Sequence, residues 1–425
     1  LLMLYFEVIL PLKLSFDPTY KYEGVEPLHI GSLVAVNFSG REYVGVVSKV
    51  HGGEYSPDPL VKPIERVEAE FPSITDEELL LWRQLSDYYL CPIGLVFRAA
   101  EKSLFETKTS RRKKESAEAV EISLPPLSEA QHKATEDIRG QFKLSSRPVL
   151  LKGVTASGKT HIYMELAKEV LEQGKSVLYL ASELAYSSQL HTRLEEAFGK
   201  EIVQAFNSLS TPAKRRDVIK RLREGKPTLV LGSKSAVFLP YRNLALIIVD
   251  EENDDSYKSR QGLYYNGRDA AIFLAQIHKA NIVLGTATPS LETLYNVQKG
   301  KFSQVCLNEK FYQDSHTELE IIDTEAEWSK FGMHGSYSRK LATHITKTLS
   351  SGSQAIILRT WKNTRKATET TGAKTLEEET RELWPEARIA WIDNSLSDGA
   401  IQEIISKFAA GEIEILLGKR IISKG

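Results

Sequence analysis

Cysteine and long apolar runs are both scarce in this chain of 425 residues. It has only two cysteines, Cys91 and Cys306, which lie far apart, and it has no Cys-x-x-Cys pair. A disulfide framework is therefore excluded, and no structural zinc site built from paired cysteines is expected. The longest apolar runs, such as residues 244–249, have the length of a strand, whereas a helix that spans a bilayer needs about 20 residues. The apolar start at 1–6 lacks a basic flank, so we interpret it as a strand and expect a cytoplasmic protein without a membrane partner.

An excess of charge of either sign is also absent. The formal net charge is −1, which argues against a generally basic nucleic-acid coat but leaves a local basic groove open. Hydrophobic residues make up 42% of the chain and charged residues 26%, as in ordinary globular domains. The length predicts roughly two to four domains with a well-buried core.

The pattern along the chain predicts an α/β fold in five parts. The first part is rich in β-branched and aromatic residues, with two strands at 34–38 and 43–47 and a helix over 76–89. A polar, basic stretch that ends at a proline pair follows, which is typical of a linker. Strand-like and helical runs then alternate, which predicts βαβ units and a parallel sheet with helices on both faces. The expected boundaries are a small mostly-β domain 1–107, a linker 108–126, a parallel-sheet lobe 127–311, a second linker 312–337 and a partial second lobe 338–425.

A complete phosphate-binding loop, Gly-Val-Thr-Ala-Ser-Gly-Lys-Thr, occupies residues 153–160 between a predicted strand and a predicted helix. Its glycines allow the backbone amides to turn inward toward phosphate oxygens, and the start of the helix adds further donors. Lys159 is expected to reach the β- and γ-phosphates, and the Thr160 hydroxyl to bind Mg²⁺. The nucleotide-binding residues predicted in this loop are Gly153, Thr155, Ser157, Gly158, Lys159 and Thr160. The alternative is a chance match in an ordinary glycine turn.

Carboxylates follow the apolar run 245–249 directly, at Asp250, Glu251 and Glu252. In open α/β sheets, ligands bind beyond the carboxyl ends of the strands. We expect Asp250 to hold Mg²⁺, largely through water, and Glu251 to orient or deprotonate the water that attacks the γ-phosphate. Lys159, Asp250 and Glu251 are thus the predicted catalytic residues. A solvated acidic turn is the competing interpretation.

Tyrosines and cations alternate shortly after these acids, between residues 254 and 268. The tyrosines are Tyr257, Tyr264 and Tyr265, and the cations are Lys258, Arg260 and Arg268. Such a mixture suits stacking on bases while phosphates are held, so we predict that Tyr257, Lys258 and Arg268 bind DNA. A polar surface loop with a few tyrosines has the same composition and stays open as the alternative.

These motifs together resemble one family, the bacterial primosomal replication-restart helicases (primosomal protein N-prime) of helicase superfamily 2. The resembling segments are the phosphate-binding loop, 250–252 with 256–258, 268–269, 285–292, 232–240, and the segments 10–12, 16–17 and 88–91 near the N-terminus. The resemblance covers about residues 4–107 and 127–310, and residues 352–425 loosely. It implies a RecA-like motor lobe and a partial second lobe, preceded by a 3′-end DNA-binding domain at 1–107.

The resemblance also implies an activity, namely ATP- and Mg²⁺-dependent 3′-to-5′ unwinding at stalled replication forks. The implied partners are forked and single-stranded DNA, primosomal proteins and single-stranded DNA-binding protein, and we expect a monomer. Gln131 matches a glutamine that recognises adenine, Lys234 matches a contact to the DNA backbone, and Thr286 and Thr288 match residues that couple hydrolysis to movement. Phe16, Asp17 and Tyr20 match the part that faces the terminal nucleotide. For Phe16 and Tyr20, a buried position in a small β domain is the alternative.

The chain departs from the family pattern in several places. Residues 108–126 are too short for a winged-helix domain, and residues 359–363 run on where the family inserts eight zinc-binding cysteines. Asn253 stands in place of a usual histidine, and the sequence ends before the motif whose arginine completes the ATP site. We therefore expect no zinc, and a truncated form that binds ATP but hydrolyses it poorly. The alternatives are a nucleotide- and fork-binding scaffold, or a superfamily 2 motor that acts on another nucleic acid.

Overall fold

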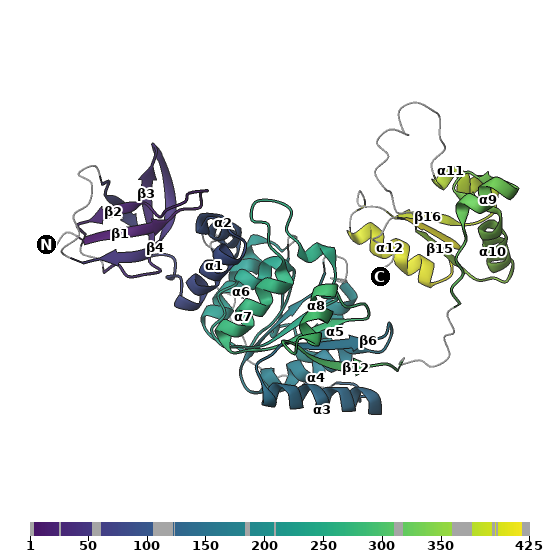
Figure 1. Cartoon of the computed structure of the whole chain (residues 1–425), viewed down its shortest axis with the longest axis horizontal. Helices are drawn as coiled ribbons and strands as arrows, with labels where there is room; N and C mark the ends of the chain where they lie inside the picture. Colours follow the sequence, from purple (N-terminus) through teal and green to yellow (C-terminus); the bar gives the residue numbers. More distant parts are fainter. Residues whose placement is uncertain are drawn as a thin grey trace. The chain divides into compact units, whose positions relative to one another are not determined.

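The computed structural model describes residues 4–24, 27–52, 61–104, 122, 124–182, 188–207, 210–309, 318–358, 376–392, 396 and 398–418 (Figure 1). The chain forms two compact units, Leu1–Gln313 and Asp314–Gly425. Most of the predicted linker 108–126 and the segment 359–363 lie outside the described residues.

The first unit begins with a five-stranded antiparallel sheet in the order β2-β1-β4-β3-β5. Its strands are β1 (Leu4–Ile9), β2 (Thr19–Tyr22), β3 (Leu33–Phe38), β4 (Arg41–His51) and β5 (Ile64–Val67). The predicted hairpin is confirmed, because β3 and β4 pair in antiparallel register from Leu33 opposite Val46 to Phe38 opposite Arg41. Ser39 and Gly40 at its tip both have positive φ, which matches the right-handed twist of a two-residue turn.

Two helices follow this sheet, α1 (Asp76–Tyr88) and α2 (Ile93–Leu104). A capping box begins α1, because Thr75 and Glu78 each bond the other's backbone N–H. Apolar side chains of both helices, such as Trp82, Leu85 and Phe97, belong to the same buried cluster as side chains of the following lobe. The two helices therefore connect the front sheet to that lobe through a shared core.

The central lobe of the first unit is built on a seven-stranded sheet in the order β12-β6-β11-β10-β7-β9-β8, with all neighbouring strands parallel. The strands are β6 (Val149–Gly153), β7 (Ser176–Leu180), β8 (Val203–Phe206), β9 (Leu229–Gly232), β10 (Leu244–Asp250), β11 (Asn281–Thr286) and β12 (Ser303–Leu307). The helices are α3 (Glu129–Leu144), α4 (Lys159–Glu172), α5 (Ser188–Phe198), α6 (Pro212–Arg223), α7 (Gly267–His278) and α8 (Leu291–Gln298), with short 3-10 helices η1 (Lys234–Phe238) and η2 (Asp255–Tyr257). The predicted parallel α/β lobe is confirmed.

Helices cover both faces of this sheet, which explains why central strands such as β7 and β9 are buried along their whole length. On one face, Ile247 and Val249 pack in a cluster with side chains of α6, α7 and the front helices. On the other face, Leu246 and Ile248 pack with side chains of α3, α4 and α5. Successive residues of β10 thus alternate between two cores, as the period of a strand requires.

The second unit is a smaller α/β body with the parallel strand order β15-β17-β16. Its strands are β15 (Ala355–Leu358), β16 (Ile389–Ile392) and β17 (Ile415–Gly418), and β13 (Met333–His334) pairs with β14 (Tyr337–Ser338). Its helices are α9 (Thr324–Phe331), α10 (Arg339–Ser350), α11 (Leu376–Leu383) and α12 (Asp398–Ala409). Tyr337, Trp384 and Ile415 lie in its core, and the α/β character predicted for this part is confirmed. None of the helices in the described parts of either unit is long and apolar enough to cross a membrane.

Candidate nucleotide-binding site

The phosphate-binding loop connects β6 to α4, as the sequence predicts. Gly158 precedes α4 in the left-handed region, with φ of 78°, and Ala156 also has positive φ, at 60°. A Cβ atom on Gly158 would lie 2.3 Å from Nε2 of Gln131, and one on Gly153 would lie 2.8 Å from Oγ of Ser157. Both positions therefore require glycine for a steric reason, and the loop closes tightly around the start of α4.

The loop has the features that the tail of a nucleoside triphosphate requires. Gly158 offers no side chain to cap α4, so the first amide groups of that helix remain donors for an anion. Among the residues that the structure describes, Ser157 has a buried hydroxyl with no hydrogen-bond partner. Lys159 donates to the carbonyl of Gly153 at 3.2 Å, which keeps its ammonium group over the loop. The residues present thus fit a phosphate chain.

Asp250 lies at the end of β10, the second strand from β6 in the sheet. Its carboxylate accepts hydrogen bonds from the hydroxyls of Tyr163, at 3.2 Å, and Tyr179, at 3.0 Å. Burial, reinforced by the nearby charge of Glu251, raises the pKa of Asp250 to about 6, although the two tyrosine hydroxyls and Lys159 oppose this rise. A buried carboxylate next to a hydroxyl-bearing loop suits a hard cation such as Mg²⁺, and Thr160 and Asp250 are the residues that would hold it.

Glu251 has an unusual backbone conformation, with φ of 48°. For a residue with a side chain, the left-handed region costs about 1–2 kcal/mol. In this conformation, its carboxylate lies 4.0 Å from Nζ of Lys159 and accepts a hydrogen bond from Oγ1 of Thr286 at 3.3 Å. The structure therefore brings together the lysine of the loop, the second acid and the first threonine.

Strand order explains why Thr286 joins this group. Strand β11 lies between β6 and β10, so its carboxyl end stands between the phosphate-binding loop and the acids. Thr286 also donates to Oδ1 of Asn253 at 2.7 Å, and Nδ2 of Asn253 donates to Oγ1 of Thr288 at 3.2 Å. Asn253 thus links the acidic segment to both threonines, and a coupling role for these threonines stays a prediction.

Gln131 is buried behind the loop at the start of α3. Its Oε1 accepts a hydrogen bond from the backbone of Ser128 in a capping box, and its Nε2 donates to the carbonyl of Ser157 at 3.1 Å. The side chain therefore ties α3 to the phosphate-binding loop. Its predicted recognition of adenine is untested by these contacts.

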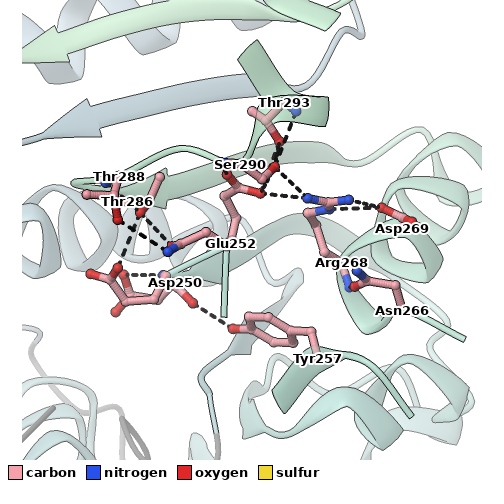
Figure 2. Close-up of polar contacts among 12 residues, drawn as sticks. Asp250, Glu252, Tyr257, Asn266, Arg268, Asp269, Thr286, Thr288, Ser290 and Thr293 are labelled. Atoms are coloured by element: carbon pink, nitrogen blue, oxygen red, sulfur yellow. Dashed lines mark hydrogen bonds and ion pairs between the residues drawn. The ribbon is translucent and has the colours of Figure 1, made fainter. Parts of the chain in front are cut away.

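The residues predicted to bind DNA near the acids do not share one surface. Tyr257 is 1% exposed, and its hydroxyl donates to the carbonyls of Leu180 and Asp250, at 3.0 and 2.6 Å. Arg268 is 8% exposed and pairs with Glu252 and Asp269 (Figure 2). Both lie inside the fold, so neither presents a free face to a base or phosphate here. Lys258 is exposed, and Lys234 is half-buried and donates to the carbonyl of Ser256 at 2.8 Å.

The three front-domain candidates also differ in exposure. Phe16 is 60% exposed, whereas Tyr20 is 2% exposed and lies in the core of the front sheet, as the alternative interpretation expected. Asp17 accepts a hydrogen bond from Ser48 at 2.8 Å, and burial raises its pKa above the ordinary value. Phe16 and Asp17 thus remain candidates for ligand contact.

Sequence reasoning missed the structural role of several important polar residues. Tyr163 and Tyr179 bond Asp250 from an adjacent helix and a neighbouring strand, 87 and 71 residues away. Glu252, Ser290 and Thr293 form a buried cluster with Arg268. The only local signal was the spacing of Ser290 and Thr293, which marks the N-cap of α8, where Ser290 accepts from the Thr293 backbone.

The central lobe, with its parallel sheet and phosphate-binding loop, is a helicase domain. Residues 7–101 match the family described as 3′DNA-binding domain (3′BD), and residues 128–297 match the DEAD/DEAH box helicase family. A replication restart protein PriA from Rickettsia felis is 31% identical to this chain over 477 aligned positions, which cover 99% of this chain and 72% of the relative. The chain therefore belongs to the family of replication restart protein PriA, a family of DNA helicases.

One more distant sequence relative agrees with this assignment. Replication restart protein PriA from Bacillus subtilis is 28% identical over 355 positions, which cover 71% of this chain and 44% of that protein. A solved structure of RecG bound to a three-way DNA junction is 18% identical, with a TM-score of 0.43 over 80% of this chain and 42% of that one. A structural match with this TM-score supports no conclusion about function, so the family assignment depends on the sequence relatives.

Proposed function

We propose that this chain is an ATP-driven DNA helicase that moves 3′ to 5′ and acts at stalled replication forks. The observation that carries the proposal is the meeting of Lys159, Glu251 and Thr286, each within 4.0 Å of the next, at the carboxyl ends of neighbouring strands. Ligands bind at this edge of open α/β sheets. Membership of the PriA family supports the choice of DNA and of replication restart.

The side chains have distinct tasks in this proposal. The loop amides and Lys159 bind the phosphates, while Glu251 orients the attacking water and accepts its proton. Thr160 and Asp250 would hold Mg²⁺, which would supply positive charge against the phosphates. Asn253 transmits the state of the acidic segment to Thr286 and Thr288, because it bonds both threonines.

DNA contact is assigned to residues that are exposed or half-buried. The match of residues 7–101 to a 3′DNA-binding domain supports Phe16 and Asp17 as contacts to a terminal nucleotide. Lys234 and Lys258 are the proposed contacts to the DNA backbone on the motor lobe. We propose forked and single-stranded DNA as substrates, primosomal proteins and single-stranded DNA-binding protein as partners, and a cytoplasmic monomer as the working form.

The first test is Lys159→Ala, with Lys152→Ala as the control. Lys152 is an exposed lysine of the same strand–loop unit, so its removal changes the net charge equally without touching the proposed site. We expect Lys159→Ala to abolish ATP binding and forked-DNA-stimulated ATPase, because the phosphates lose their only loop cation. Equilibrium titration with ATP and steady-state ATPase with and without forked DNA measure both effects.

Three results of this test distinguish the candidate functions. Unchanged ATP affinity in Lys159→Ala would contradict the site assignment. ATP binding without turnover by the wild-type chain would favour a nucleotide- and fork-binding scaffold. Stimulation by RNA equal to that by forked DNA would favour a motor that acts on another nucleic acid.

A further inference from the structure

The third acid of the segment, Glu252, points away from the nucleotide site and into the protein. Its carboxylate is fully buried, although it follows directly after the partly exposed Glu251. Figure 2 shows Arg268, Ser290 and Thr293 gathered around it. A buried carboxylate is costly unless hydrogen bonds and a counter-charge satisfy it, so this environment calls for an explanation.

The Glu252 carboxylate accepts four hydrogen bonds from two helices. Oε1 accepts from the Ser290 backbone N–H at 2.7 Å, and Oε2 accepts from the Ser290 hydroxyl at 3.1 Å. Oε2 also accepts from the Thr293 hydroxyl at 3.0 Å and from Arg268 Nη1 at 2.9 Å. Arg268 is balanced in turn by Asp269. Glu252 is therefore fixed to the N-terminal turns of both α7 and α8.

The residues on either side of Glu251 are thus held in place. After it, Glu252 is fixed by this cluster and by its own N–H, which donates to the carbonyl of Gly285 at 3.1 Å. Before it, the Asp250 carbonyl accepts the hydroxyl of Tyr257 at 2.6 Å. Left-handed backbone at a residue with a side chain persists only where the surroundings over-determine it. Both flanking anchors supply that constraint for Glu251.

We propose that Glu252, Arg268, Ser290 and Thr293 are positioning residues that hold Glu251 in its left-handed conformation. In this arrangement, the Glu251 carboxylate faces Lys159 and Thr286. The inference rests on the proposed ATP hydrolysis, in which Glu251 orients the water. It gives Arg268 a role in the reaction through Glu252, in place of a contact with DNA.

The test combines two substitutions in the cluster with one at Glu251. Arg268→Met removes the charge and keeps an unbranched apolar stem, and Thr293→Val removes one hydroxyl donor and keeps the shape. We expect Arg268→Met to lower kcat about 10- to 100-fold and Thr293→Val to lower it several-fold, while affinities for a non-hydrolysable ATP analogue and for forked DNA stay within about threefold. Thr293→Ser keeps the donor and should restore kcat, and Glu292→Gln, an exposed acid of the same helix turn, serves as the control.

A double-mutant cycle with Glu251→Gln separates positioning from general support of the fold. If the cluster acts through Glu251, Arg268→Met causes no further loss of kcat in the Glu251→Gln background. Equal losses in both backgrounds, unchanged kcat in Arg268→Met, or a fall in DNA affinity that matches the fall in kcat would each overturn the inference. Should Arg268→Met fail to fold, the comparison of Thr293→Val with Thr293→Ser decides in the same way. Unchanged kcat in Glu251→Gln itself would overturn the proposed role of Glu251, and this inference with it.

Discussion

Asp250 binds its proton more tightly than an exposed aspartate does, since burial and the charge of Glu251 disfavour the ionised form. The hydroxyls of Tyr163 and Tyr179 work in the opposite direction by bonding the carboxylate. A group whose pKa is raised in the folded state contributes stability at low pH that is lost as pH rises through the folded pKa, here about 6. At neutral pH Asp250 is ionised and buried, and this lowers the free energy of unfolding of the ligand-free protein.

This balance predicts how pH controls ATP hydrolysis. Only the ionised carboxylate suits Mg²⁺, so kcat/KM, which reports the free enzyme, should fall as pH drops through about 6. Tyr179→Phe removes a hydrogen bond that lowers the pKa of Asp250, so the midpoint should move to higher pH. Tyr295→Phe, at an exposed tyrosine of α8, is the control and should leave the profile unchanged. A midpoint that stays in place in Tyr179→Phe would contradict the role of this hydroxyl.

For single residues, the sequence predicts the features of one contiguous segment but not the contacts between distant segments. The phosphate-binding loop is contiguous, so glycine at 153 and 158 could be expected from the motif alone, although the side chain nearest to Gly158 is Gln131 of α3. The partners of Asp250 and Glu252 come from other elements, and only the folded chain brings them close. Residue type was ambiguous for Tyr257, because a tyrosine suits a buried hydrogen bond as well as a stacking surface.

Strand β11 carries a glycine, Gly285, at the position where it faces the side chain of Tyr163. A Cβ atom on Gly285 would lie 1.6 Å from the hydroxyl oxygen of Tyr163, the side chain that bonds Asp250. Tyr163 is fully buried and has little room to retreat. Gly285 therefore leaves the space in which the Tyr163 hydroxyl reaches the carboxylate of Asp250.

We expect Gly285→Ala to lower the free energy of unfolding by about 1–3 kcal/mol, because it overpacks the core. It should also lower kcat, because Tyr163 must leave Asp250. Gly140→Ala in α3 is the matched control: its Cβ would have no heavy atom within 4 Å, and alanine in a helix should stabilise the protein by about 0.5–1 kcal/mol. Urea unfolding and steady-state ATPase check both variants. Equal stability of Gly285→Ala and wild type would contradict the steric argument.

The strands of the central sheet could largely be predicted from the sequence, but their order within the sheet could not. Short continuous apolar runs predict the strands at 176–180, 244–249 and 281–284, because both faces of each strand are buried. No local pattern shows that β11 inserts between β6 and β10, since this order depends on crossovers and packing between distant segments. That insertion is what places Thr286 beside Glu251.

In the first unit, the front sheet and the motor lobe meet through α1 and α2. Arg223 of α6 donates to the carbonyl of Ser73 at 3.3 Å and lies 3.7 Å from Glu78, with both charged side chains almost fully buried. The Asn266 N–H, at the start of α7, donates to the hydroxyl of Tyr89 at 2.9 Å. The change of composition near residue 108 predicted a boundary, but composition does not report which helices share a core. The boundary at 107 stays a prediction.

These contacts pack the front sheet and the motor lobe against the same helices, and they lead to a prediction for the whole molecule. We expect a fork with a blocked 3′ hydroxyl to bind several-fold more weakly than one with a free end, and to stimulate ATPase less. Phe16→Ala should remove this difference, because Phe16 offers an exposed ring beside Asp17. Phe331→Ala, at a phenylalanine that is also 60% exposed, should preserve it. The proposed contacts of the motor lobe with the DNA backbone do not depend on how a strand ends. Equal affinity for blocked and free ends would therefore refute end recognition by the front sheet and leave the assignment of the phosphate site intact.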